Sequence, residues 1–293
     1  GQSERAKKGQ PFTVLTVEEI IQRGVRVKNG KWSGRQFEIP LYNAIQLPHQ
    51  DLSIDSYVLG VWLGDGSKGG GRYTGIDKEV SEEIISRGYQ LGKEYKEFTR
   101  TILGIKPHLS DLCLVNLGSH ERYIPNYYLK SSIQQRKDIL SGLLDTDGCI
   151  GKDGSIEFDS TSPQLALDVV WLVRSLGGNS RIKDTIKKPF YYDKDKNKIS
   201  GRDCYRVSIK LPFNPFKILR KAERWKPSVS KTQTRYLTRY IDKIEFSHVE
   251  DSLCVKVSHP SGCYLSNDFI VTHNSCLEAW LAWNFLLTRP YPK

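Results

Sequence analysis

Two aspartates, each followed by glycine, end two similar apolar segments of this chain and are its strongest candidates for chemistry. The segments read Val58-Leu-Gly-Val-Trp-Leu-Gly-Asp-Gly66 and Leu140-Ser-Gly-Leu-Leu-Asp-Thr-Asp-Gly148, so that Asp65 and Asp147 occupy the same place in each. The spacing between the two segments suits one repeat of a small α/β unit. Two carboxylates that meet repel each other unless a divalent cation lies between them. The pair therefore indicates a site for a hard metal ion.

Both segments are apolar with a period near 3.6 and stop at Asp-Gly, which predicts two buried helices that end at glycine C-caps. Gly60 and Gly64 lie on one helix face, as do Gly142 and Thr146, so the helix axes can approach closely. We expect Gly60, Gly64 and Gly142 at the helix interface and both aspartates side by side at its end. Asp145 faces another direction and is expected to be a neighbour of the site, not a ligand. A single Asp-Gly is commonly a turn after a helix; a matched pair is not.

The paired segments resemble the double LAGLIDADG motif of homing endonucleases, over about residues 50–230. The resemblance implies an α+β fold of two pseudo-symmetric αββαββα repeats, at about residues 49–130 and 131–235, with a curved antiparallel DNA-binding saddle. It further implies cleavage of double-stranded DNA by metal-activated water, with Asp65 and Asp147 binding Mg²⁺ and each serving one strand. A bound metal lowers the pKa of its water and screens the charge of the scissile phosphate.

One position departs from the family's pattern. Family members often carry a lysine just before Ile-Pro, upstream of the second motif; here the run is His120-Glu-Arg-Tyr-Ile-Pro125, and Arg122 stands in that place. Arginine keeps the charge but cannot donate a proton in the same way. We therefore list Arg122 among the candidate catalytic residues and keep a DNA-binding protein that has lost cleavage as an alternative. In the second repeat, Lys221 or Lys226 is the matching residue.

The order of elements is expected to be the same in the two repeats, giving one continuous sheet surface. In the first repeat the sequence predicts a helix over 79–102 and a strand over 109–117. In the second it predicts a hairpin within 149–161, a helix over 163–176 with Ser162 as N-cap, a strand pair at 181–188 and 205–211, and a helix over 215–225.

The chain of 293 residues is basic, with 44 Lys and Arg against 33 Asp and Glu, a net charge of +11 and a pI near 9.2. This balance favours a polyanionic partner, here double-stranded DNA at the host-gene site that lacks the insertion, although a basic surface with no specific partner remains an alternative. The DNA-binding candidates lie on predicted strands and turns: Lys68, Arg72, Lys152, Arg181, Lys183, Lys187, Lys188, Arg206 and Lys210. Tyr191 and Tyr192, beside two of these lysines, either stack on bases or face solvent.

A second kind of chemistry appears near the C-terminal end, in His273-Asn-Ser275. The side-chain amide of Asn274 can attack its own backbone carbonyl, His273 can protonate the leaving amine, and the hydroxyl of Ser275 can accept an acyl group. After a β-like stretch and a LAGLIDADG unit, this tripeptide resembles the C-terminal splicing block of inteins, and His259 matches an auxiliary polar position. The resemblance implies that residues 236–274 form a small all-β half of an intein splicing domain, followed by host sequence over 275–293.

The family's other half has no counterpart near the N-terminal end. Residues 1–48 read as a lead-in and subdomain, with a short helix from Thr16 to Gly24 and a hairpin around Lys28 to Lys31. An intein needs a first Cys or Ser and a Thr-x-x-His motif, and residues 1–30 show neither. We therefore expect a truncated intein, or the C-terminal partner of a split one that binds an N-terminal half.

Residues 275–293 resemble the helix after the phosphate-binding loop of phage terminase large subunits. A fragment of an interrupted terminase ATPase is thus a third interpretation, and a generic hydrophobic helix a fourth. No Gly-x-x-x-x-Gly-Lys precedes Ser275, and the glycine run at 67–74 lacks the Gly-Lys-Ser/Thr ending of a phosphate loop. Six cysteines without a CxxC pair, no secretion signal and no membrane-length apolar run lead us to expect a monomer in the cytoplasm of a bacterial or phage-infected cell.

Overall fold

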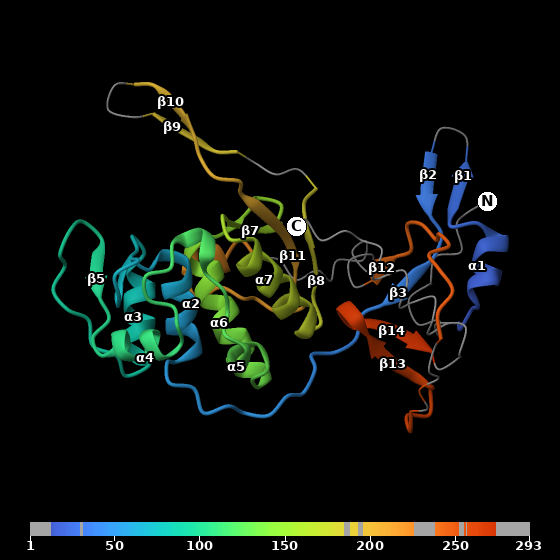
Figure 1. Cartoon of the computed structure of the whole chain (residues 1–293), viewed down its shortest axis with the longest axis horizontal. Coiled ribbons are helices and arrows are strands. Elements are labelled where there is room, and N and C mark those ends of the chain that lie inside the picture. The colour runs from blue at the N-terminus through green and yellow to red at the C-terminus, as the bar shows by residue number, and fades with distance from the viewer. Residues whose placement is uncertain are drawn as a thin grey trace. The chain divides into compact units, whose positions relative to one another are not determined.

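The computed structural model describes residues 13–29, 32–184, 188–192, 196–225, 238–251, 255 and 257–273 (Figure 1). The chain divides into two compact units. The larger unit is Asn43–Ser228, and the smaller one combines Gly1–Tyr42 with Val229–Lys293. Among the described residues, no helix is both long enough and apolar enough to cross a membrane.

Two adjacent helices, α2 (Ser56–Asp65) and α6 (Ile133–Thr146), form the centre of the larger unit (Figure 1). The carboxylate of Asp55 accepts hydrogen bonds from the first turn of α2, and Ser132 forms a capping box with Gln135 at the start of α6. These caps satisfy amide groups that a helix leaves unpaired at its N-terminal end. The apolar side chains of both helices belong to one buried core.

Glycines let the backbones of α2 and α6 touch. A methyl group at Gly60 would collide with the carbonyl oxygen of Ile139 and lie 3.1 Å from the Cα of Gly142. A methyl group at Gly142 would in turn collide with the carbonyl oxygen of Tyr57. No side chain fits between the helices at this crossing, so the axes approach as closely as the backbone allows.

The predicted glycine C-cap is confirmed for α2, whose C-cap is Gly66, and wrong for α6, whose C-cap is Asp147. Gly66 has φ of −71°, in the extended region, and Gly148 does not have a positive φ. Both glycines are instead required for space. A Cβ at Gly66 would collide with the carbonyl oxygen of Trp62, and one at Gly148 with that of Leu144. The chain turns back over its own last helical turn here, which only glycine permits.

The second repeat forms a four-stranded antiparallel sheet in the order β6-β7-β11-β8, with α7 packed against it. Its elements are β6 (Gly148–Ile150), β7 (Ile156–Ser160), α7 (Pro163–Ser175), β8 (Asn179–Ile182), β11 (Tyr205–Lys210) and α8 (Leu219–Ala222). The predicted hairpin, the Ser162 cap and the strand pair are confirmed. The helix predicted over 215–225 shrinks to α8, because the carboxylate of Asp145 holds the amides of Lys217 and Ile218 in an extended entry.

The first repeat departs more from the prediction. Its elements are β4 (Arg72–Thr74), α3 (Lys78–Ser86), β5 (Thr99–Thr101), α4 (Ile105–Asp111), the 3₁₀ turn η1 (Ser119–Glu121) and α5 (Asn126–Leu129). The helix predicted over 79–102 ends at Ser86, since Gly88 is left-handed with φ of 86°. The strand predicted over 109–117 is also wrong. Ile105 and Leu109, four residues apart, bury one face of a helix there.

The single continuous sheet is likewise wrong for the described residues, because the first repeat contributes only the two-stranded β4–β5 sheet. Isolated bridges at Gly66–Tyr73 and Leu91–Ile102 stand where the second repeat has the pairs β6–β7 and β8–β11. The pairing order is thus repeated, but the strands are shorter. The run from Gly66 to Gly71 is rich in glycine, which lacks the side chains that stabilise a strand.

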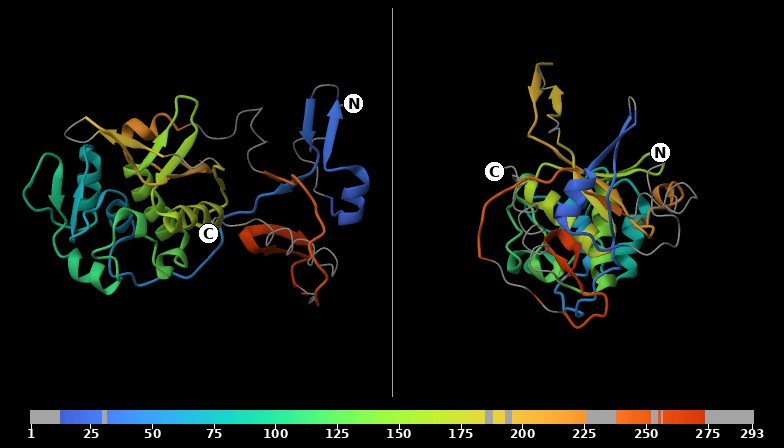
Figure 2. Two further views of the ribbon diagram at one scale, coloured as in Figure 1. Left: turned by 45° about the horizontal axis from the view of Figure 1, so that its top comes forward. Right: turned by 90° about the vertical axis from the view of Figure 1, so that its right-hand side faces the viewer.

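A separate two-stranded sheet interrupts the second repeat between β8 and β11. Strands β9 (Phe190–Tyr192) and β10 (Lys198–Ser200) pair with each other, and we call them the β9–β10 ribbon. Figures 1 and 2 show that the ribbon stands away from the helices of its unit.

The smaller unit contains α1 (Val17–Arg23), whose capping box between Thr16 and Glu19 confirms the predicted start. Its strands form three two-stranded sheets: β1 (Arg26–Asn29) with β2 (Trp32–Arg35), β3 (Glu38–Pro40) with β12 (Thr238–Tyr240), and β13 (Cys263–Ser266) with β14 (Ile270–His273), joined by the 3₁₀ turn η3 (Asn267–Phe269). In the part of the chain that the structure describes, the residues of the buried apolar core all belong to the larger unit. Among the described apolar residues of the smaller unit, only Ile20, at 9% exposure, is buried.

Candidate functional site

The two predicted aspartates lie at the adjoining C-terminal ends of the central helices. Asp65 is the last residue of α2, and Asp147 is the C-cap of α6. A methyl group at Gly64, next to Asp65, would lie 3.3 Å from Oδ2 of Asp147. The structure therefore brings both carboxyl groups to one place, where the negative ends of two helix dipoles also meet.

The electrostatics of this place resist two negative charges. The pKa of Asp147 rises to about 7, first because the surrounding protein desolvates the carboxyl group and second because Asp65 is charged. Desolvation also raises the pKa of Asp65, while the charges of Lys221 and Arg122 oppose that rise. Although its carboxyl group is partly desolvated, the Asp147 residue keeps an exposed face, and Asp65 beside it is half-buried. An external cation can therefore reach the pair.

Arg122 lies beneath Asp65, almost completely buried. Its guanidinium donates hydrogen bonds to the carbonyl oxygens of Trp62, Leu63, Gly64 and Gly66, at distances that include 2.8 Å to Leu63 and 2.9 Å to Gly64. The guanidinium carbon also lies 4.9 Å from the centre of the Trp62 ring. The carbonyl oxygens of Leu63, Gly64 and Gly66 lie past the last intrahelical donor of α2, whereas that of Trp62 also accepts the amide of Gly66 at 2.8 Å. Arg122 thus caps the helix that carries Asp65.

Lys221 does the same for the other helix. Its ammonium group donates to the carbonyl oxygens of Leu144, Asp145, Thr146 and Gly148, at 2.6 to 3.5 Å. In the aligned segments these four positions are the counterparts of the four that bind Arg122. The two repeats therefore share one arrangement, in which the last segment of each repeat returns a cation to the end of its first helix. Of the two lysines proposed as the counterpart of Arg122, Lys221 occupies this place and Lys226 lies outside the described residues.

Asp145 is held away from the aspartate pair, as the helix periodicity indicates. It accepts a hydrogen bond from the Tyr57 hydroxyl at 3.0 Å and from the backbone amides that precede α8. Burial raises its pKa to about 6, and these hydrogen bonds oppose the rise. Asp145 thereby fixes the segment that brings Lys221 to α6.

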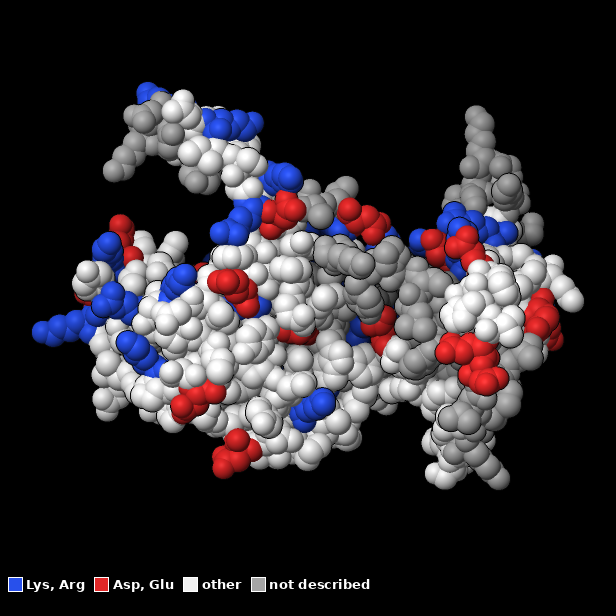
Figure 3. Space-filling model, in the orientation of Figure 1, with Lys and Arg blue, Asp and Glu red and all other residues white. Residues whose placement is uncertain are grey.

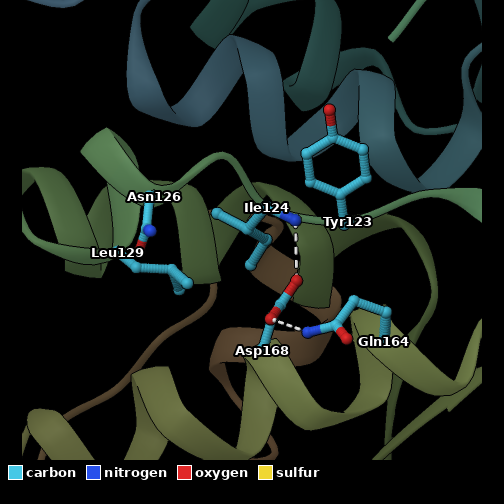
Figure 4. Close-up of a pocket in the computed structure, with 6 residues that line it drawn as sticks. All are labelled: Tyr123, Ile124, Asn126, Leu129, Gln164 and Asp168. Carbon is cyan, nitrogen blue, oxygen red and sulfur yellow. Dashed lines mark hydrogen bonds between the residues drawn. The ribbon is translucent and has the colours of Figure 1, made fainter. Parts of the chain in front are cut away.

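A pocket of about 280 Å³ beside α7 shows what holds the Arg122 segment (Figure 4). There the carboxylate of Asp168 accepts hydrogen bonds from the backbone amide of Ile124 at 2.7 Å and from the side chain of Gln164 at 2.8 Å. Nearby, Ser162 donates to the carbonyl oxygen of Arg122 at 2.6 Å. Sequence reasoning missed Asp168, and it assigned Ser162 only a cap. The available signal was an acidic residue on the apolar face of a predicted helix. Such a residue indicates a buried hydrogen-bond partner, but the sequence does not identify that partner.

The predicted DNA-binding residues differ in whether an acidic side chain lies close to their positive charge. On the outer face of the four-stranded sheet, Arg206 forms ion pairs with Asp159 and Glu157, and Lys183 pairs with Glu157. Arg181 pairs with Asp184, and Lys188 lies 3.5 Å from Asp203. These acidic partners offset part of the positive charge of these side chains.

Other members of the set are more open. Lys68 and Lys152 are exposed, and the guanidinium of Arg72 lies 4.4 Å from the centre of the Tyr95 ring. Lys210 ends β11, where partial burial lowers its pKa. Lys187 lies outside the described residues.

Of the predicted splicing residues, only His273 is described. It ends β14, paired with Cys263 on β13. His259 accepts or donates a hydrogen bond with Ser261 at 2.7 Å. Asn274 and Ser275 lie outside the described residues, as does the whole of 275–293.

Comparison with known proteins assigns part of this architecture. Residues 134–210, which include Asp147, match the LAGLIDADG-like domain family. The replicative DNA helicase DnaB of Mycobacterium intracellulare is 30% identical over 235 residues, which cover 80% of this chain and 37% of the helicase. The ATP-dependent DNA helicase Hel308 of Thermococcus kodakarensis is 24% identical over 221 residues, which cover 66% of this chain and 19% of the helicase. The chain therefore spans well under half the length of these relatives.

Among solved structures, the homing endonuclease I-DmoI in complex with DNA and Ca shares 13% identity at a TM-score of 0.36, covering 58% of this chain and 94% of that one. Mesophilic variants of I-DmoI also share 13% identity at a TM-score of 0.34, covering 58% of this chain and 86% of theirs. These TM-scores are too low to add to the argument. What stands is a LAGLIDADG-like domain, in a mixed α and β fold, with the second aspartate inside it.

Proposed function

We propose that the unit 43–228 is a LAGLIDADG homing endonuclease that hydrolyses both strands of a specific DNA site, and that it is embedded in an intein. The observation that carries the proposal is the meeting of Asp65 and Asp147 at two helix ends that are built alike. Each end carries one carboxylate above four carbonyl groups that one buried cation holds. A site made twice suits a target with two strands.

The donor set fits Mg²⁺. No group of three or more His, Cys, Asp or Glu side chains that could enclose a metal exists among the described residues. Mg²⁺ does not need such a cage, since it is usually held by one or two carboxylates, with water and substrate phosphates completing the shell. Asp65 and Asp147 would bind it. The attraction of both carboxylates to the cation would then outweigh the repulsion between them. When bound, the ion would supply an activated water and charge screening at the phosphate.

The chain's own residues position this chemistry. Arg122 and Lys221 hold the ends of α2 and α6, and so set where the two carboxylates lie. Their hydrogen bonds go to backbone carbonyl groups, although the Nε of Arg122 has no hydrogen-bond partner among the described residues, and both side chains are buried. We therefore assign them as positioning residues that reduce the negative potential beneath the metal site, in place of the catalytic role suggested by sequence for Arg122.

The presence of an arginine, Arg122, at the end of α2 favours a second candidate function, that of a DNA-binding protein that no longer cleaves DNA. If cleavage needs a cation that can move a proton at the first helix end, Arg122 cannot supply it, because an arginine stays protonated. Arg122→Lys distinguishes the candidates, since it restores at α2 the cation that α6 already has.

The experiment uses the full chain and a DNA duplex with the host-gene sequence from which the intein-coding insertion has been removed, so that the two flanking sequences are joined. In Mg²⁺ we expect cutting of both strands, lost in EDTA and in Asp65→Asn and Asp147→Asn. Asp111→Asn, an exposed carboxylate of the same unit, is the matched control and should cut normally. Binding without cutting by the wild type, together with cutting by Arg122→Lys, would establish the second candidate.

A readout independent of cleavage tests the metal site. Mg²⁺ bound by the folded state raises the melting temperature of the wild type. We expect this rise to disappear in Asp147→Asn and to persist in Asp111→Asn. An equal rise in all three proteins would place the bound ion elsewhere.

The intein context rests on the His273-Asn274-Ser275 sequence and is supported by the relatives. Two different helicases match most of this chain over a minor part of their own length, as expected if the shared part is an insertion in different hosts. We propose that His273 assists cyclisation of Asn274 and that Ser275 begins the host sequence, whether the host is a helicase or the terminase that residues 275–293 resemble. An N-terminal splicing half would complete the machine.

Slow release of residues 275–293 from the purified protein, followed by mass spectrometry, tests this part. The expected product ends in the succinimide of Asn274. Asn274→Ala should abolish release and His273→Ala should slow it. Release that continues in Asn274→Ala would show ordinary proteolysis and remove the splicing proposal.

A further inference from the structure

The β9–β10 ribbon carries two exposed aromatic side chains on one face. Phe190 and Tyr192 alternate with Tyr191 along β9 and so point to the same side, and they are 53% and 63% exposed. Their rings meet edge to face with centroids 5.8 Å apart. Lys198, opposite Tyr192 in the register, places its ammonium group 4.0 Å from the centre of the Phe190 ring.

Folding of the larger unit does not explain this face. None of the described side chains of β9 and β10 belongs to the unit's buried core. A two-stranded sheet alone is marginally stable in water, and exposed aromatic rings add to the cost. Such a face on a projecting ribbon is typical of a surface that binds a partner.

The charge of the ribbon identifies the kind of partner. Residues 183–203 contain seven lysines and arginines and four aspartates. Figure 3 shows Lys and Arg gathered along the ribbon and at its foot. Rings flanked by ammonium groups suit nucleic acid, because bases and sugar edges meet the rings while phosphates meet the lysines. A two-stranded ribbon also has the width that the major groove of DNA admits.

We propose that the β9–β10 ribbon is a second contact with duplex DNA, outside the four-stranded sheet, which lies in a groove on the flank next to the second repeat. This inference rests on the proposed function. The first repeat has no such ribbon in the part of the chain that the structure describes, since the segment between Leu91 and Ile102 closes tightly through the Lys96–Thr99 bridge. The protected DNA is therefore longer on one side of the cleavage site than on the other.

Hydroxyl-radical footprinting tests this asymmetry with the full chain, on the rejoined host-gene duplex extended by several helical turns on both sides and kept intact by EDTA. The test variant is Phe190→Ser with Tyr192→Ser, and the control is Tyr127→Ser. Tyr127 is 67% exposed on α5 of the same unit, so both variants remove solvent-exposed rings. We expect the test variant alone to lose protection on one flank and to bind about tenfold more weakly.

Lys196→Ala with Lys198→Ala adds an electrostatic readout. We expect the slope of log affinity against log salt to fall by roughly one to two, since the lysines lie near phosphates. A wild type that binds with a symmetric footprint, or variants with unchanged footprint, affinity and salt slope, would overturn the inference and point to a protein partner for the ribbon. Absence of any binding by the wild type would overturn the proposed function as well, so the two failures differ.

Discussion

At the scale of single residues, the affinity of the site for a cation depends on which buried charges lack a partner of opposite charge. Arg122 and Lys221 are buried cations: desolvation lowers the pKa of each, and their carbonyl partners offset part of the cost of burial. At the aspartate pair, desolvation of the carboxyl group and the charge of Asp65 together raise the pKa of Asp147 to about 7. The pair therefore lowers the free energy of unfolding when no metal is bound.

Asp147→Asn should remove that loss. Between the ordinary aspartate pKa of 3.8 and about 7, the folded protein holds the Asp147 proton while the unfolded chain releases it. The folded state then binds more protons, so stability falls as pH rises through this window. We expect the variant to gain about 1 kcal/mol of unfolding free energy at pH 8, a value reduced for solvent screening, and almost nothing at pH 4. Urea denaturation at both pH values measures it; a gain of equal size at both would contradict the assignment.

Arg122→Met should be costly for a different reason. The substitution removes the donor of the Leu63, Gly64 and Gly66 carbonyl groups at the end of α2, and we expect a loss of about 3 kcal/mol. Arg122→Lys should lose about 1 kcal/mol or less, because Lys221 shows that one ammonium group can serve the same four positions. Equal losses in both variants, measured by urea denaturation, would show that the guanidinium shape, not its hydrogen bonding, matters.

At the scale of elements, the approach of α2 and α6 positions everything at their ends. The helices meet at glycines, so their separation is set by backbone contact and cannot be adjusted by a side-chain rotamer. The elements around them are less constrained. The second repeat keeps four paired strands while the first keeps two, and both still return a cation to their own first helix.

Gly142→Ala tests this interface. The added methyl group would collide with the Tyr57 carbonyl oxygen and lie 2.7 Å from the amide nitrogen of Val61, both of them backbone atoms. We expect a loss of at least about 3 kcal/mol, or failure to fold. Gly69→Ala is the control, since nothing lies within 4 Å of the added group there. If the two variants melt at the same temperature, the helices are not in backbone contact.

At the scale of the whole molecule, the two units differ in what holds them together. The larger unit contains the whole buried apolar core, whereas the smaller one has three two-stranded sheets and one buried apolar side chain among its described residues. Because hydrophobic burial is the main favourable term in folding, the larger unit has the means to fold alone.

A protein of residues 43–228 should therefore show a cooperative thermal transition and bind the same duplex as the full chain. We expect its affinity to fall steeply with salt, as for any protein that neutralises several phosphates. Circular dichroism melts and binding titrations at two salt concentrations measure both properties. A fragment that does not melt cooperatively would show that the larger unit depends on the smaller one.

The sequence by itself determined the central pair of helices, because glycine spacing and apolar periodicity within each segment are local properties that packing did not override. It determined the second repeat for the same reason, since Ser162, Pro163 and the 152–154 turn are strong local signals. Only the tertiary structure decided that Arg122 and Lys221 cap equivalent helix ends and that Asp168 holds the Arg122 segment, because these partners lie far apart in sequence. It also decided the shortened first repeat and the ion pairs of Arg206. The length of a strand depends on the strand it pairs with, and the net charge at a basic residue depends on nearby acidic side chains. Both kinds of neighbour can come from distant parts of the sequence.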